Sequence, residues 1–144
     1  MATTRRAEVT WTGDLMKGSG FVTAASSNLF KEAAVSWAAR TESPNKTSPE
    51  ELLAAAHASC FAMALSSELE KVDLAPENID SKATVTLDKV ETGFAVTTSH
   101  LEVTVKLGNP DRSKFERAAE AARAGCPISK LIASAKITLD AKLA

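Results

Sequence analysis

The chain has 144 residues, and its 17 basic and 18 acidic side chains give a formal net charge of −1. This length suffices for one hydrophobic core, and we expect a single domain over residues 1–144. The interspersed charge gives no basic stripe for nucleic acid, and the lack of tyrosine argues against a base-stacking surface. No apolar run follows the arginines near the start, and no apolar stretch reaches membrane-spanning length, so we expect a cytoplasmic protein without a membrane segment.

The first forty residues are predicted to form three strands. "AEVTWTG" alternates in hydropathy, with Ala7, Val9 and Trp11 on one face, which predicts a half-buried strand. "GSGFVTA" and "AAVSWAAR" are shorter strand candidates on either side of a polar turn, "SSNLFKE". Residues 40–46, "RTESPNK", are polar and include a proline, so we expect a loop.

A long helix is predicted from Pro49 to about Lys71. Ser48 suits the N-cap position and Glu51 suits N3, so the two predict a capping box, with Pro49 at N1. Small residues dominate "LAAAHASC", which indicates close contact with another helix or a sheet.

The second half predicts a hairpin, two helices and a final strand. "SKATVTLDKV" and "FAVTTSHLEVTVKL" alternate around "ETG", which indicates a β-hairpin. A capped helix is predicted from Ser113, ending at Gly125 with a positive φ. Its apolar stripe would comprise Phe115, Ala118, Ala119 and Ala122. A short helix at "PISKLIASA" and a strand at "KITLDAKL" complete an α+β chain of order β(3)-α-β(2)-α(2)-β.

The two cysteines are the main candidates for chemistry. They are too far apart in sequence for a CxxC redox motif or a zinc-finger spacing. Cys60, near the middle of the long helix, is either a small buried hydrophobe or a reactive thiol. Cys126 directly precedes a predicted helix start, where free N–H groups favour a thiolate. The alternative to a reactive role is that Cys126 lies in a tight turn that needs a small residue.

Two histidines and two charged residues are weaker candidates. His57 lies one turn before Cys60, so it predicts either a thiol–imidazole pair or a hydrogen-bonded core histidine. His100 lies on the polar face of its strand, where we expect it to be solvated. Glu50 either serves a site or stabilises the helix start, and Arg40 either serves a site or aids solubility. With no metal-ligand set and no phosphate loop, we expect no metal and no cofactor.

The segments around both cysteines resemble the OsmC/Ohr family of thiol-dependent hydroperoxide peroxidases. The resemblance covers nearly the whole chain. It is strongest in "SPEELLAAAHASCFAMALS" and "AGCPISKLI", with support from "WTGDLMKGSG" and "LDKVETGFAV". "AAHASCF" and "AGCPIS" are similar to the OsmC branch. The resemblance implies an intertwined homodimer, in which each subunit adds strands to its partner's sheet around buried helices.

The resemblance also implies an activity and a site. Organic hydroperoxides, and more weakly hydrogen peroxide, would be reduced by Cys60, with Cys126 as the resolving cysteine. Glu50 matches the acid of the motif, and Arg40 is matched to the catalytic arginine of the OsmC branch. Lys17 lies in the loop where the Ohr branch would supply that arginine. The family chemistry ends in a disulfide that a dithiol, often of lipoyl type, reduces.

Two other functions remain open at this point. The same cysteines could serve a redox sensor with little turnover, or a non-catalytic dimer could bind a small hydrophobic ligand. The position of Glu50 adds a constraint, because ten residues of helix separate it from Cys60 by roughly 15 Å along the axis. We therefore expect two copies of the helix to cross near Ala55, which would bring Glu50 of one chain toward Cys60 of the other.

Overall fold

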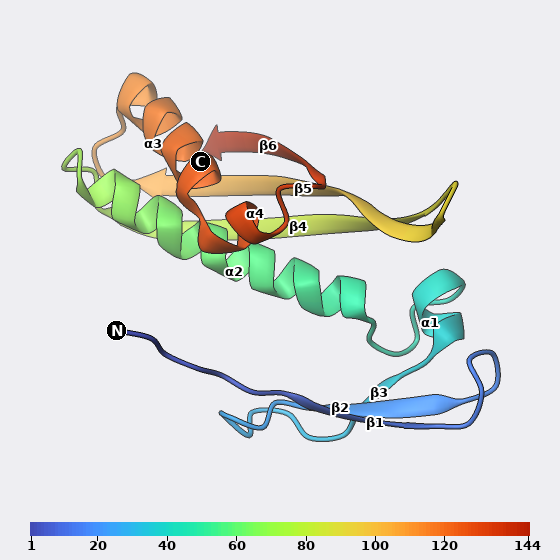
Figure 1. The fold of residues 1–144 in the computed structure, drawn as a ribbon. Helices are drawn as coiled ribbons and strands as arrows, with labels where there is room; N and C mark the ends of the chain where they lie inside the picture. The colour runs from blue at the N-terminus through green and yellow to red at the C-terminus, as the bar shows by residue number, and fades with distance from the viewer. The chain divides into compact units, whose positions relative to one another are not determined.

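The computed structural model describes residues 1–144 and divides into two compact units, Met1–Leu52 and Leu53–Ala144 (Figure 1). The predicted α+β class and the order of the predicted elements are confirmed, with one additional short helix. Each unit contains a three-stranded sheet, and the long helix α2 (Pro49–Glu70) begins in the first unit and continues into the second.

The first unit is an antiparallel sheet of order β1-β2-β3. Its strands are β1 (Glu8–Thr12), β2 (Ser19–Thr23) and β3 (Ala33–Val35). The prediction that "AAVSWAAR" is all strand was wrong, because α1 (Trp37–Thr41) follows β3 at once. The Ser36 hydroxyl accepts a hydrogen bond from the Ala39 N–H at 3.1 Å, and this cap starts a helix in residues that were predicted as strand.

Helix α2 begins where the sequence predicts. Ser48 Oγ accepts a hydrogen bond from the Glu51 N–H at 3.1 Å, as the capping box requires. The return bond differs from the prediction, because the Glu51 carboxylate accepts from the Thr47 hydroxyl at 2.8 Å and not from Ser48. A threonine hydroxyl four residues earlier therefore replaces the backbone N–H as the partner of Glu51.

The length of α2 corrects a second prediction. An 18-residue window within its 22 residues reaches a mean hydropathy of 1.3, so one apolar stretch does have membrane-spanning length and composition. Phe61, Leu65 and Leu69 on this helix are fully buried in the core of the second unit. The apolar character of α2 is thus that of a core helix.

The sheet of the second unit has the order β4-β5-β6. Strands β4 (Pro76–Val90) and β5 (Gly93–Leu107) form the predicted hairpin, and β6 (Lys136–Leu143) runs parallel to β5. Along β5, Leu101, Val103 and Val105 are buried while the intervening residues are exposed, so one face of the sheet carries the core.

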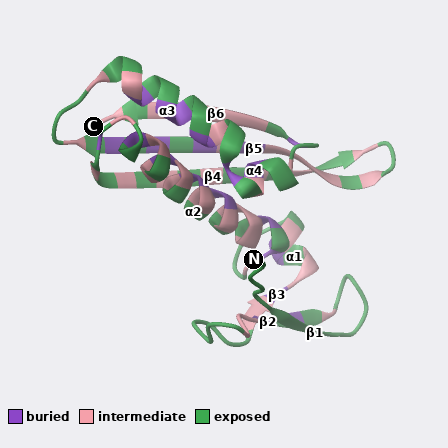
Figure 2. Cartoon of the chain, turned by 60° about the vertical axis from the view of Figure 1, so that its left-hand side comes forward, coloured by how far each residue is buried: buried purple, intermediate pink, exposed green.

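Helices α3 (Arg112–Gly125) and α4 (Pro127–Leu131) connect β5 to β6, because parallel neighbours need a crossover. The predicted apolar stripe of α3 is confirmed: all four of its members are buried against the β5 side chains and α2 (Figure 2). The second unit is therefore a two-layer structure in which α2 and α3 cover one face of the sheet.

Both ends of α3 differ from the sequence prediction. The cap is Asp111, whose carboxylate accepts from the Lys114 N–H at 3.1 Å, and not Ser113. Gly125 is the last helical residue, and its φ is not positive. The helix ends because Cys126 precedes Pro127, which disfavours helical backbone at Cys126 and holds it at φ −57° and ψ 122°.

The corrected cap gives a stability prediction. Asp111→Ala should lower the free energy of unfolding by about 1 kcal/mol, because the Lys114 N–H loses its acceptor. Ser113→Ala is the matched control and should change it by less than about 0.5 kcal/mol. Urea unfolding at one fixed protein concentration measures both. A larger loss of unfolding free energy in the Ser113 variant would show that Ser113 is the N-cap, as the sequence predicted.

Candidate active site

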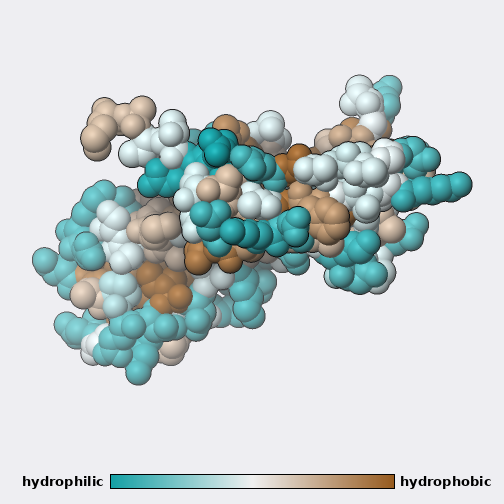
Figure 3. Space-filling model, turned by 90° about the horizontal axis from the view of Figure 1, so that it is seen from below, coloured by the Kyte–Doolittle hydropathy of each residue, from teal (hydrophilic) through white to brown (hydrophobic).

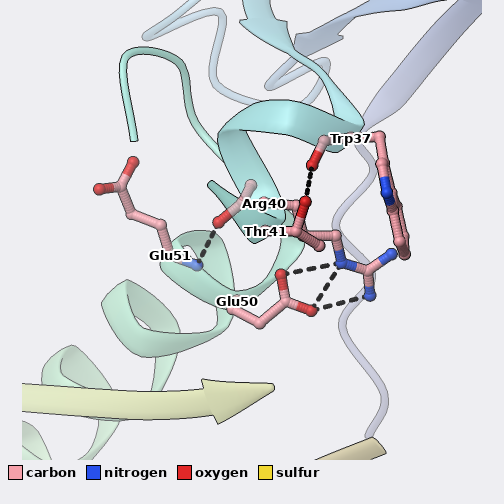
Figure 4. Close-up of polar contacts among 6 residues, drawn as sticks. Trp37, Arg40, Thr41, Glu50 and Glu51 are labelled. Atoms are coloured by element: carbon pink, nitrogen blue, oxygen red, sulfur yellow. Dashed lines mark hydrogen bonds and ion pairs between the residues drawn. The ribbon is translucent and has the colours of Figure 1, made fainter. Parts of the chain in front are cut away.

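Arg40 and Glu50 form an ion pair within the first unit (Figure 4). Arg40 Nε lies 2.9 and 3.1 Å from the two carboxylate oxygens, and Nη2 lies 2.8 Å from Oε1. The guanidinium carbon also lies 5.7 Å from the centre of the Trp37 ring, a cation–π geometry. Arg40 is therefore held on two sides, and its remaining N–H groups are fixed in direction.

The local structure explains how this pair arises. Arg40 lies in the last turn of α1 and Glu50 in the first turn of α2, so the connecting loop brings them together. The prediction placed Arg40 at the end of a strand, and its helical position is a correction. Glu50 is only 8% exposed, and a carboxylate at that depth needs a charged or hydrogen-bonding partner. Arg40 is that partner.

An apolar cavity of about 590 Å³ lies beside Arg40 in the same unit. Arg40 is its one charged lining residue. The others are Ala7, Val9, Trp11, Leu15, Val22, Val35, Ser36, Trp37, Pro49 and Leu52. Val9 is 61% exposed and Trp11 40% exposed, so the strand predicted to be half-buried is uncovered in the single chain. Figure 3 shows hydrophobic side chains (brown) exposed between hydrophilic ones on one face of the chain.

Cys60 and Cys126 lie together in the second unit. Cys60 projects from α2, and Cys126 forms the link between α3 and α4. Both are free thiols, and their side chains lie near each other. Cys60 is half-buried, whereas Cys126 is fully buried. Two thiols so placed can form a disulfide when one of them is oxidised.

The two thiols differ in acidity. Burial raises the pKa of Cys60, and the neighbouring Cys126 raises it further, against a lowering by the Ile128 N–H. Burial also opposes ionisation of Cys126. Other interactions outweigh burial and lower the pKa of Cys126; they involve the Ser129 N–H, the Cys60 thiol, the Ser129 hydroxyl and the Ile128 N–H. In the single chain, Cys126 is therefore the better thiolate, as its position before a helix start predicts.

His57 is a buried core histidine and does not pair with Cys60. Its Nδ1 lies 2.6 Å from Ser99 Oγ and its Nε2 lies 2.8 Å from Ser129 Oγ. Burial lowers the pKa of His57, which favours the neutral ring. Neither serine was predicted from the sequence to contact His57. Ser99 was detectable, since it lies two residues before Leu101 on the apolar face of its strand.

Two further predictions can be compared with the structure. His100 is half-buried and its Nδ1 lies 2.6 Å from Thr138 Oγ1, so the expectation of a solvated histidine was wrong. The partner strand β6 explains this, because it pairs His100 with Thr138 directly. Lys17 is exposed, and its backbone N–H donates to Asp14 Oδ1 at 2.7 Å.

Comparison with known proteins adds independent findings. Residues 41–142 match the family described as OsmC-like protein. The chain is 40% identical, over 96% of each chain, to peroxiredoxin OsmC of Escherichia coli. It resembles the crystal structure of the organic hydroperoxide resistance protein OhrB of Bacillus subtilis, with 26% identity, coverage of 96% and 98%, and a TM-score of 0.66. An OsmC-like protein of unknown function from Vibrio cholerae shares the fold with a TM-score of 0.75 at 18% identity and coverage of 97% and 99%.

The coupling of the two thiols can be measured. Cys126→Ala should lower the pKa of Cys60 relative to the wild-type protein, because it removes a neighbour that raises it. The pH at which iodoacetamide labelling of Cys60 reaches half its maximal rate, followed by mass spectrometry of its peptide, reports this shift. Gly125→Ala is the control, because a methyl group there contacts nothing within 4 Å. A raised midpoint in Cys126→Ala would contradict the contact between the thiols.

Proposed function

This chain belongs to the family of OsmC-like proteins, and we propose that it reduces organic hydroperoxides, and more weakly hydrogen peroxide, with Cys60 and Cys126. It is a homologue of peroxiredoxin OsmC and thus a cysteine-based peroxidase. The observation that carries the proposal is the contact between two free thiols from distant parts of the sequence. A structural role for either cysteine would not need the other.

The reaction follows from the thiol chemistry. The Cys60 thiolate attacks one peroxide oxygen, the O–O bond breaks, and the alkoxide leaves as an alcohol after it takes up a proton. Cys60 is then a sulfenic acid. The Cys126 thiolate attacks the Cys60 sulfur and displaces hydroxide, which leaves as water, so a disulfide forms. A dithiol, which we propose to be of lipoyl type, reduces the disulfide and is itself oxidised to a cyclic disulfide.

Activation of Cys60 requires a cation, because burial and Cys126 raise its pKa in the single chain. The middle of a helix offers little help from the helix dipole. We propose that Arg40 supplies the charge and binds the peroxide oxygens, while Glu50 orients the guanidinium through the bonds described above. Ten residues of unbroken helix separate Glu50 from Cys60, so we assign the Arg40–Glu50 pair at each Cys60 to the partner subunit.

A homodimer is supported by the uncovered apolar surface of the first unit. Val9 and Trp11 alternate on β1 as in a half-buried strand, yet both are exposed in one chain. A second copy would cover them. We propose that residues 1–144 act as one domain within such a dimer, in the cytoplasm, without a cofactor or metal.

The cysteine roles are tested by two variants. Cys60→Ser should abolish consumption of an organic hydroperoxide, because the nucleophile is lost. Cys126→Ser should consume about one equivalent per subunit and then stop with Cys60 over-oxidised. Steady-state turnover with a dithiol and single-turnover mass spectrometry measure these outcomes. Full activity of the Cys60 variant would refute the peroxidase function, and little turnover of the wild type would favour the redox sensor.

The shared site is tested with mixed dimers. Glu50→Ala and Cys60→Ser should each be inactive alone, but after subunit exchange one of the two sites in a mixed dimer holds wild-type Glu50 and Cys60. Activity should return to about half that of a wild-type dimer, because a two-fold interface creates two equivalent sites. The readout is peroxide turnover after exchange, with exchange itself verified by native mass spectrometry.

The matched control mixes Cys60→Ser with Cys126→Ser. Both cysteines of a site come from one chain, so this mixture should stay without turnover. If exchange occurs and neither mixture regains activity, Glu50 acts within its own chain or only at the helix start.

A further inference from the structure

His57 is the one buried titratable group of the second unit that the proposed reaction does not use. It is fully buried, and so is Ser99, while Ser129 is 4% exposed. The three residues come from α2, β5 and α4. The Ser129 hydroxyl contacts His57 Nε2 at 2.8 Å and also interacts with the Cys126 side chain. Hydrogen bonds therefore run from Ser99 through His57 to Ser129, which lies three residues after Cys126 in α4 and interacts with its thiol.

The direction of these hydrogen bonds depends on the charge of the sulfur. A neutral imidazole has one donor and one acceptor nitrogen, so only two arrangements satisfy both serines. In the first, Ser99 O–H donates to Nδ1, Nε2–H donates to Ser129 Oγ, and the Ser129 proton is left for the sulfur. In the second, Nδ1–H donates to Ser99 and the Ser129 proton goes to Nε2. A Cys126 thiolate selects the first arrangement because it needs a donor.

We propose that His57 is a positioning residue for Cys126, holding the Ser129 hydroxyl as a donor to the thiolate that leaves when the disulfide is reduced at Cys60. This inference rests on the proposed function. The reductant thiolate forms a bond to the Cys60 sulfur, the Cys60–Cys126 bond breaks, and the electron pair stays on Cys126. The second thiol of the reductant then releases Cys60 as a thiolate and closes the reductant's own disulfide.

Two features of the site make the attack occur at Cys60. Cys60 is half-buried while Cys126 has no exposed surface, so a reductant reaches Cys60. A thiol–disulfide exchange is also faster when the leaving sulfur is the better stabilised thiolate, and here that sulfur is Cys126. Because the donors are buried, no water replaces a lost hydroxyl, and each bond is stronger than it would be in solvent.

Ser129→Ala tests the proposal with a minimal change, since it removes one oxygen and keeps the backbone N–H. Reduction of the preformed disulfide by dihydrolipoamide should slow roughly threefold to tenfold, the range expected for one lost hydrogen bond to a leaving thiolate. The kcat/KM for the hydroperoxide should stay within about twofold of wild type, because the Cys60 attack precedes the step in which Cys126 leaves. A merely structural role would lower both half-reactions together.

His57 itself is tested by a pair of variants. His57→Gln offers an amide that can donate to Ser129 and accept from Ser99, and it should keep most of the wild-type reduction rate. His57→Phe removes both contacts and should match Ser129→Ala. Thr138→Val is the control, because it breaks another histidine–hydroxyl contact on the same sheet, His100–Thr138, that does not involve a cysteine. It should leave both half-reactions unchanged.

The outcomes separate this inference from the proposed function. If the wild-type protein forms no Cys60–Cys126 disulfide with peroxide, the proposed function fails. If the disulfide forms but Ser129→Ala is reduced at the wild-type rate, or if both half-reactions fall equally, the positioning role of His57 is refuted. Should His57→Phe fail to fold, Ser129→Ala decides alone. A second readout is the equilibrium with a lipoamide redox buffer, where Ser129→Ala should leave a larger oxidised fraction.

Discussion

The packing of α2 against β5 fixes the positions of Cys60 and His57 in the second unit. Phe61, Leu65 and Leu69 on the helix meet Leu101, Val103 and Val105 on the strand, and all six are almost fully buried. Each such side chain stabilises the fold by about 1.5–3 kcal/mol. Together they set the rotation of α2 about its axis, and this rotation places Cys60 and His57. The packing of the core therefore determines where Cys60 and His57 lie.

A second constraint places Cys126. The residue before a proline avoids helical backbone, so Pro127 ends α3 and makes Cys126 the joint between two helices. The pattern "GCPIS" therefore carries two functions at once. Proline fixes the backbone at the thiol, and the serine three residues after the thiol lowers the pKa of that thiol through its backbone N–H and its hydroxyl.

Most of the fold was predictable from local patterns. Alternation along β5 and the apolar stripe of α3 identified the core faces, because each period matches its secondary structure. The errors occurred where several residues compete for one backbone group. Asp111, not Ser113, caps α3, and Ser36 starts a helix in residues with a strand-like pattern. Which residue caps a helix depends on which side chain can hydrogen-bond to the free backbone N–H groups. The spacing of residues in the sequence does not decide this.

The site was predictable in part. The resemblance singled out Arg40 and Glu50, and the structure pairs them with bonds of 2.8 to 3.1 Å. The spacing of His57 and Cys60 was misleading, since residues one helical turn apart can meet only if no stronger partner exists. Ser99 and Ser129, from β5 and α4, are those partners, and only the tertiary fold brings them to His57.

The two thiols of one subunit differ in acidity in opposite directions. An isolated subunit holds Cys60 with a raised pKa and Cys126 with a lowered one, which suits resolution and reduction but not peroxide attack. The Arg40–Glu50 pair lies in the first unit of the chain, with Glu50 in the first turn of α2. In the proposed dimer, a nucleophile that is activated from the partner subunit would be unreactive before assembly. A monomer released during synthesis would then keep its attacking thiol protonated, and oxidation would await the dimer that also supplies the peroxide site.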